Sequence, residues 1–93
     1  SKDNISGIVD LLMADLNSRL ADREIAIKLT ESAKQHIIDQ GYDQVYGARP
    51  LKRYLQKNVE TLVAKMILAG SVSTQSAIVI DYDGTELRAE NEK

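Results

Sequence analysis

The stretch that most constrains the fold is residues 41–53, Gly-Tyr-Asp-Gln-Val-Tyr-Gly-Ala-Arg-Pro-Leu-Lys-Arg. Gly41 and Gly47 permit backbone conformations with positive φ, so both are predicted to lie in turns or at helix ends. Pro50 has a φ preset near the helical value and lacks an N–H, which suits the first turn of a helix. The stretch therefore predicts one helix that ends near Gly41, a turn, and another helix that begins near Pro50.

Basic residues gather at the start of that second helix. Arg49, Lys52, Arg53 and Lys57 share one face by the i, i+3, i+4 rule, and we call these four residues the basic ridge. A helix start carries a partial positive charge and unpaired N–H groups, so cations are unfavourable there and anions favourable. This placement indicates an anion-binding site. Two other interpretations remain open: an ion pair with an internal acid such as Asp43, and a solvated basic face.

Hydrophobic periodicity predicts three helices. The first covers residues 4–21, the second runs from about 31 to 40, and the third runs from 48 or 50 to about 69. The third helix carries a continuous apolar stripe in which Leu62 and Ile67 are expected to be buried.

Two strands and a hairpin complete the pattern. Alternating apolar residues predict strands at 24–29 and 77–82. Asp83-Gly84 predicts a two-residue type I′ turn that returns through residues 85–88, with the charged residues 89–93 frayed. The expected class is α+β in the order α-β-α-α-β-β, with three helices packed on a small sheet of two to three strands.

The totals fit one domain covering residues 1–93. Twelve basic against fourteen acidic residues give a net charge of -2, which argues against a dedicated nucleic-acid-binding protein. The absence of cysteine excludes disulfides and thiolate metal sites. No apolar run approaches the ~20 residues of a membrane span, and no signal peptide is visible, so we expect a cytoplasmic protein without a membrane partner.

The residues needed for catalysis are absent from the chain. It has no Gly-x-x-x-x-Gly-Lys-Ser/Thr phosphate loop and no strand that ends in paired acids. His36 is the one histidine, and no Asp, Cys or second His stands at ligand spacing, so no metal site is expected. The chain alone is therefore not expected to be an enzyme.

The segment from Tyr46 to Arg53, Tyr-Gly-Ala-Arg-Pro-Leu-Lys-Arg, preceded by Gly-Tyr-Asp at 41–43, resembles the second-sensor segment of the Clp/heat-shock AAA+ ATPases. The resemblance extends from about residue 5 to about residue 87. In that family the Gly-Ala-Arg core lies in the small C-terminal subdomain of an ATPase module. The sequence segments 7–13, 20–23 and 81–84 are most similar to the second module of the ClpB disaggregases, while ClpC and ClpA share the Gly-Ala-Arg motif.

The resemblance implies a role for each motif residue. Arg49 is expected to be the second sensor, which reaches the γ-phosphate and acts in catalysis only within a parent ATPase. Gly47 and Ala48 are expected to lie close to the nucleotide. Ile8 is expected to line the adenine pocket, with Ile5 and Val9 as alternatives.

The resemblance also implies cofactors and partners. They are ATP or ADP with Mg²⁺ in the parent, and none in the isolated chain. The expected partners are a large AAA+ subdomain of the same parent chain, neighbouring protomers of a hexamer, and unfolded or aggregated protein as substrate. The alternative is a free-standing interaction module that binds acidic peptide or nucleic acid through the basic ridge.

Overall fold

The computed structural model describes residues 2–72 and 77–92. The helices are α1 (Lys2–Leu20), a 3₁₀ turn (Ala21–Arg23), α2 (Glu31–Gly41), α3 (Arg49–Tyr54), a π-helical segment (Leu55–Glu60) and α4 (Thr61–Leu68). The strands are β1 (Ala26–Leu29), β2 (Ala77–Tyr82) and β3 (Leu87–Asn91). Because α3, the π segment and α4 form one rod, the predicted α+β class and element order are confirmed. Residues 73–76 of the predicted loop lie outside the described residues.

The sheet has the order β1-β2-β3, so the strand that comes second in the chain is also the central one. β2 runs parallel to β1, with Ile27 opposite Ile78, and antiparallel to β3, with Ile80 opposite Ala89. A parallel pair needs a long crossover. Here the crossover is formed by α2 and the rod.

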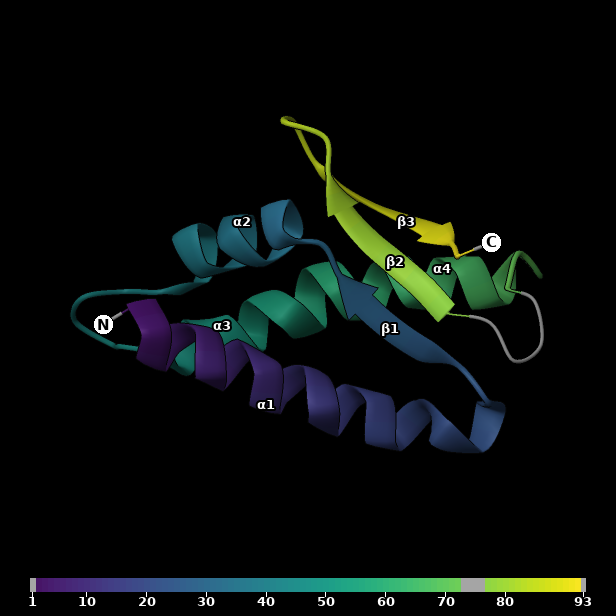
Figure 1. Ribbon diagram of the computed structural model, residues 1–93, viewed down its shortest axis with the longest axis horizontal. Coiled ribbons are helices and arrows are strands. Elements are labelled where there is room, and N and C mark those ends of the chain that lie inside the picture. Colours follow the sequence, from purple (N-terminus) through teal and green to yellow (C-terminus); the bar gives the residue numbers. More distant parts are fainter. Residues whose placement is uncertain (1, 73–76, 93) are drawn as a thin grey trace.

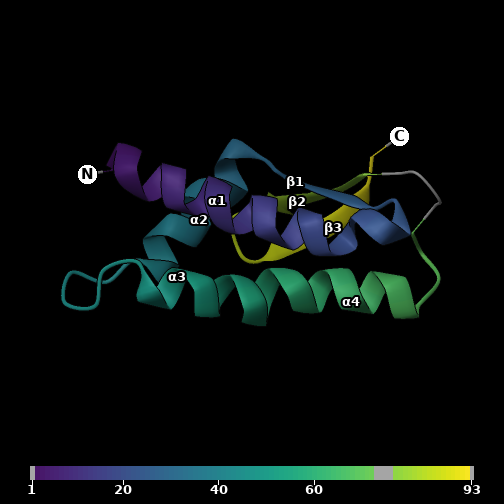
Figure 2. The same ribbon diagram turned by 90° about the horizontal axis from the view of Figure 1, so that it is seen from below.

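The helices cover one face and one edge of this sheet (Figures 1 and 2). The rod crosses one face, and α1 runs beside the outer edge of β1. Ile27, Ile78 and Ile80 are buried, while residues that alternate with them are exposed or half-buried. This alternation is typical of a sheet with one packed face. The core therefore lies between the sheet, the rod, α1 and α2.

Asn17 of α1 closes the outer edge of β1. Its Nδ2–H donates to the carbonyl oxygen of Ile27 at 3.2 Å, and the Ile27 N–H donates to Asn17 Oδ1 at 2.7 Å. One side-chain amide thus satisfies the two backbone groups that a neighbouring strand would otherwise pair.

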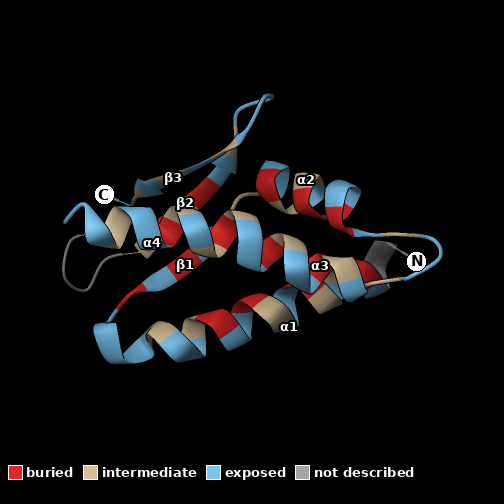
Figure 3. Cartoon of the chain, turned by 180° about the vertical axis from the view of Figure 1, so that it is seen from behind, coloured by how far each residue is buried: buried red, intermediate tan, exposed pale blue. Residues whose placement is uncertain are grey.

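The rod keeps its apolar stripe aligned by widening one turn. Leu51, Leu55, Val59 and Val63 are buried and stand four residues apart (Figure 3). In a regular α-helix this spacing would rotate the last position by about 120° relative to the first, at 100° per residue. The π-helical segment between Leu55 and Glu60 has more residues per turn, which reduces that rotation.

The predicted burial on the rod was wrong at two positions. Leu62 and Ile67 are only half-buried: Leu62 lies off the buried stripe, whereas Ile67 continues its four-residue spacing at the end of α4 and packs against the edge of the core. Val63 occupies the buried position in that turn, at 3% exposure.

Gly41 was predicted to lie at a helix end, and this is confirmed, but the reason for glycine there is not a positive φ. It is the last residue of α2, and the glycines with positive φ among the described residues are Gly47, Gly70 and Gly84. A Cβ at Gly41 would lie 2.7 Å from Leu51 Cδ2 and 3.1 Å from Leu51 Cα. Glycine is required there because α2 and α3 approach closely.

The predicted hairpin turn was also wrong. Tyr82 pairs with Leu87, so the loop has four residues, 83–86, and the Asp83 N–H donates to the Glu86 carbonyl. Asp83 Oδ1 accepts from the N–H groups of Thr85 and Glu86 at 2.8 and 2.9 Å, which stabilises the longer loop. The return strand consequently extends to Asn91, through residues that were predicted to be frayed.

Candidate functional site

The loop before α3 is held by its own polar groups. Asp43 and Gly47 exchange backbone hydrogen bonds, and Gly47 has φ of 68°, as predicted. The Asp43 carboxylate accepts from the N–H groups of Val45 and Tyr46 at 2.7 and 2.9 Å. The loop is therefore a defined turn that delivers the chain to the start of the rod.

Arg49 is the first residue of that rod, and its side chain is exposed. Ala48 at the N-cap supplies no side-chain hydrogen bond, and the first turn contains no acid. Within residues 2–72 and 77–92, the Arg49 side chain makes no ion pair or hydrogen bond. The possible pairing with Asp43 is not observed, because that carboxylate binds the loop N–H groups instead.

A hollow of about 270 Å³ lies beside Arg49 and is lined by Tyr46, Arg49, Pro50 and Arg53. Ligand sites commonly occupy roughly 300–1,000 Å³, so this open hollow offers one wall of such a site. Tyr46 is 67% exposed and its neighbour Val45 is 83% exposed. Tyr46 was not among the predicted site residues, although an aromatic residue directly before the Gly-Ala-Arg core was a visible signal.

The other predicted nucleotide residues lie near this hollow without lining it. The N-terminal part of α1 and the loop before α3 lie at the same end of the molecule (Figures 1 and 2). Gly47, Ala48 and Ile8 are half-buried, so each keeps some surface. Ile5 at 8% and Val9 at 0% exposure belong to the core, so of the three predicted candidates Ile8 is the one with surface to offer.

The basic ridge differs from four other cations of the chain. Arg19, Lys28, Lys34 and Arg88 each form an ion pair with Asp or Glu. Arg49, Lys52, Arg53 and Lys57 are all exposed, and none of them has an ion pair in the part of the chain that the structure describes. The ridge therefore carries an uncompensated positive charge along the rod.

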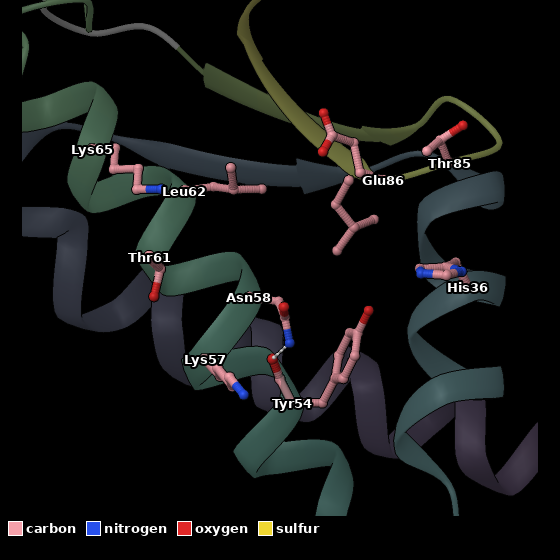
Figure 4. A pocket seen from close by; sticks show the side chains of 10 residues that line it. His36, Tyr54, Lys57, Asn58, Thr61, Leu62, Lys65, Thr85 and Glu86 are labelled. Atoms are coloured by element: carbon pink, nitrogen blue, oxygen red, sulfur yellow. Dashed lines mark hydrogen bonds between the residues drawn. The ribbon is translucent and has the colours of Figure 1, made fainter.

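A second cleft separates the rod from the β2–β3 hairpin (Figure 4). At one end of it the His36 ring stacks on Tyr82, with ring centroids 3.8 Å apart, and meets Tyr54 edge to face at 6.4 Å. Burial, followed by the neighbouring Tyr82, raises the pKa of Tyr54 above its usual value. The histidine thus contributes an aromatic contact, and no group of three metal-ligating side chains occurs among the described residues.

In the described part of the chain, no helix is both long and apolar enough to cross a bilayer.

Comparison with known proteins gives a consistent family. The family described as "C-terminal, D2-small domain, of ClpB protein" matches residues 1–80. Chaperone protein ClpB of Bacillus anthracis is 48% identical over 85 residues, which cover 91% of this chain and 10% of the relative. ClpB of Aquifex aeolicus is 49% identical over 82 residues, 88% of this chain and 8% of the relative.

A relative with a different name shares the same region. The ATP-dependent Clp protease ATP-binding subunit ClpC of Staphylococcus saprophyticus is 42% identical over 88 residues, which cover 95% of this chain and 11% of the relative. The chain thus spans about a tenth of the length of the curated relatives it matches. With its three-helix, three-stranded α+β fold and the match over residues 1–80, this chain belongs to the family of C-terminal D2-small domains of ClpB proteins.

Proposed function

We propose that this domain senses the nucleotide of a ClpB-type ATPase, with Arg49 as the group that contacts the γ-phosphate. The observation that carries the proposal is the exposed Arg49 guanidinium, which lies beside a hollow and has no acidic partner among the described residues. A guanidinium is always charged and can bind two phosphate oxygens at once.

The geometry suggests how contact at Arg49 becomes movement of the domain. Leu51 and Leu55 follow Arg49 on the rod and are buried at 0% and 5% exposure, so the start of the rod is fixed to the core. A displacement of Arg49 would therefore carry the sheet and the other helices with it. Because only ATP has a γ-phosphate, loss of this contact on hydrolysis would release the domain.

The remaining parts of the proposal concern the whole ATPase. A large AAA+ subdomain of the same parent would supply the phosphate loop and the acids that hold Mg²⁺. Gly47, Ala48 and Ile8 would form the wall that this domain contributes to the nucleotide site. The domain would also contact neighbouring protomers of a cytoplasmic hexamer that acts on unfolded or aggregated protein. The isolated chain would bind nucleotide weakly and would not hydrolyse ATP.

The test replaces Arg49 in a full-length ATPase that carries this domain. Arg49→Ala is expected to impair ATP turnover, or the coupling of turnover to recovery of an aggregated reporter enzyme. Arg23→Ala is the matched control, because Arg23 is exposed, has no ion pair among the described residues and lies beyond the far end of α1. That control should leave both activities unchanged.

The isolated chain separates a sensing role from a structural one. Arg49→Ala should change its free energy of unfolding by less than about 0.5 kcal/mol, as for other exposed positions. Marked destabilisation of the chain, together with normal turnover in the full-length protein, would show that Arg49 serves the fold. Normal stability with normal turnover and coupling would remove the sensing role altogether.

A further inference from the structure

Two adjoining hollows form a groove along the rod, one beside the C-terminal end of α2 and the other beside the β2–β3 hairpin. Each has a volume of about 350 Å³, and both are lined by Tyr54, Lys57 and Asn58. The hollow beside α2 is also lined by Gln40 and Arg53, and the hollow beside the hairpin continues to Lys65. Figure 4 shows Lys57, Thr61 and Lys65 on the rod, with Thr85 and Glu86 of the hairpin across the opening. We call this feature the helix–hairpin groove; it begins one turn beyond Arg49.

The rod bank of the groove is strongly basic. Arg53, Lys57 and Lys65 are exposed, and no ion pair compensates them among the described residues. Residues 49–68 hold five basic residues and one acid, whereas the rest of the chain holds seven basic and thirteen acidic residues. The single acid, Glu60, is bound to Arg19 of α1 at 3.0 Å. An acidic partner would therefore be attracted to this rod and repelled by the rest of the domain.

The aromatic side chains that line the groove, His36 and Tyr54, already contact other aromatic rings. His36 covers the face of Tyr82, and its ring also meets Tyr54. Proteins that bind single-stranded nucleic acid offer free aromatic faces on which bases stack. The opposite bank also carries Glu86, which repels a continuous phosphate backbone but leaves room for a chain whose charged groups alternate with neutral ones. These features favour a peptide over a nucleic acid.

We propose that the helix–hairpin groove binds an acidic protein segment in an extended conformation. Arg53, Lys57, Thr61 and Lys65 follow each other at four-residue intervals, which correspond to about 6 Å along a helix. Two residues of an extended chain cover about 6.6 Å. Acidic side chains at alternate positions of the segment would therefore reach successive turns of the rod. The bank from Arg53 to Lys65 is about 18 Å long and accommodates five to six extended residues.

The experiment uses the 93-residue chain and a fluorescein-labelled peptide with glutamate and serine at alternate positions. Fluorescence anisotropy at an ionic strength of about 10 mM, where charges interact over roughly 30 Å, should show binding that is lost near 1 M salt. A peptide of the same composition with all glutamates in one block should bind more weakly. A thymidine oligonucleotide of equal charge should also bind more weakly.

Single substitutions locate the binding. Lys57→Gln and Lys65→Gln should each lower the affinity by about two- to fivefold, as expected for one exposed charge pair. Arg23→Gln removes the same charge outside the groove and should leave the affinity unchanged. Glu86→Gln should raise the affinity, because it removes the acid from the opposite bank. Thermal unfolding of each variant checks that the fold is retained.

The results distinguish the proposal from its rivals. Equal effects of Lys57→Gln, Lys65→Gln and Arg23→Gln would show unspecific attraction and overturn it. Tighter binding of the oligonucleotide than of the alternating peptide would assign the groove to nucleic acid. Absence of peptide binding at low salt would also overturn it. Because Lys65 lies about four turns from Arg49, none of these outcomes bears on the nucleotide-sensing proposal.

Discussion

The hydrogen bonds between Asn17 and Ile27 lead to the sharpest prediction about stability. Asn17→Ala removes the side-chain donor to the Ile27 carbonyl and the side-chain acceptor for the Ile27 N–H, and Ile27 is only 3% exposed. Each lost hydrogen bond typically costs about 0.5–1.5 kcal/mol, so the substitution should lower the free energy of unfolding by about 1–3 kcal/mol. For a domain of this size that loss corresponds to a fall in Tm of roughly 4–20 °C.

Urea unfolding followed by far-UV circular dichroism measures this change. Ser18→Ala is the matched control, because Ser18 is the exposed neighbour on the same helix and serine and asparagine have similar helix propensities. Asn17→Ala should also promote self-association at high concentration, since it opens the edge of β1. If Asn17→Ala and Ser18→Ala differ by less than about 0.5 kcal/mol, the hydrogen bonds do not hold this edge.

A second substitution tests the geometry at the same position. Asn17→Asp keeps an acceptor for the Ile27 N–H but replaces the donor with an oxygen that faces the Ile27 carbonyl. The protonated carboxyl group can donate to that carbonyl, so the pKa of the introduced group should be higher in the folded state. The stability that this proton supplies is present at low pH and is lost as the pH rises through the folded pKa. The deficit of Asn17→Asp relative to wild type should therefore shrink as the pH falls through the raised pKa and be smallest below the ordinary aspartate value of about 4.

Three further predictions concern other parts of the fold. Gly41→Ala should destabilise the chain by about 1–3 kcal/mol because the new Cβ meets Leu51. Gly7→Ala should instead stabilise α1 by up to about 1 kcal/mol, because Gly7 has open space around it. Urea unfolding checks both. In the same assay Leu51→Ala should cost about 2–5 kcal/mol and the half-buried Leu62→Ala clearly less, and equal losses would contradict the assignment of the rod's buried face. The N–H groups of Glu86 and Thr85, with Arg88, hold the pKa of Asp83 below its ordinary value of 3.8. Wild type should therefore have a higher Tm than Asp83→Asn above that pH, and the difference should disappear as the pH falls through the lowered pKa. Tm measured against pH checks this.

The helices and the strands β1 and β2 could be predicted because their apolar residues repeat with a clear period. The buried residues of β2, Ile78 and Ile80, follow strict alternation, and the buried residues of α2 and the rod follow helical spacing. The four-residue repeat on the rod was visible in the sequence, but its compatibility with a π-helical turn depends on how the rod packs against the sheet. For that reason Leu62 was assigned to the core, although its neighbour Val63 is the buried residue, and Ile67, which continues the repeat at the end of α4, is only half-buried.

The errors arose where one residue type serves two purposes. Glycine fits a positive φ as well as a close approach, and only the position of Leu51 shows that Gly41 serves the second purpose. Asp-Gly fits a two-residue turn as well as a longer one, and the Asp83 carboxylate selects the longer one by accepting two N–H groups. Local charge arguments indicated an anion site at Arg49 and left a pairing with Asp43 open, whereas the hollow beside Arg49 depends on the path of the loop that carries Tyr46.

The parallel pairing of β1 with β2 has a consequence for the order in which the chain can fold. Ala26 pairs with Ala77, so the two strands close a segment of about fifty residues. Such closure is entropically costly and slows folding relative to local contacts. β2 is also the central strand, so β1 and β3 pair with it and not with each other. During synthesis, all the helices and β1 therefore emerge before the central strand. The sheet can assemble only when almost the whole domain has been made, which makes its completion a late and all-or-none event.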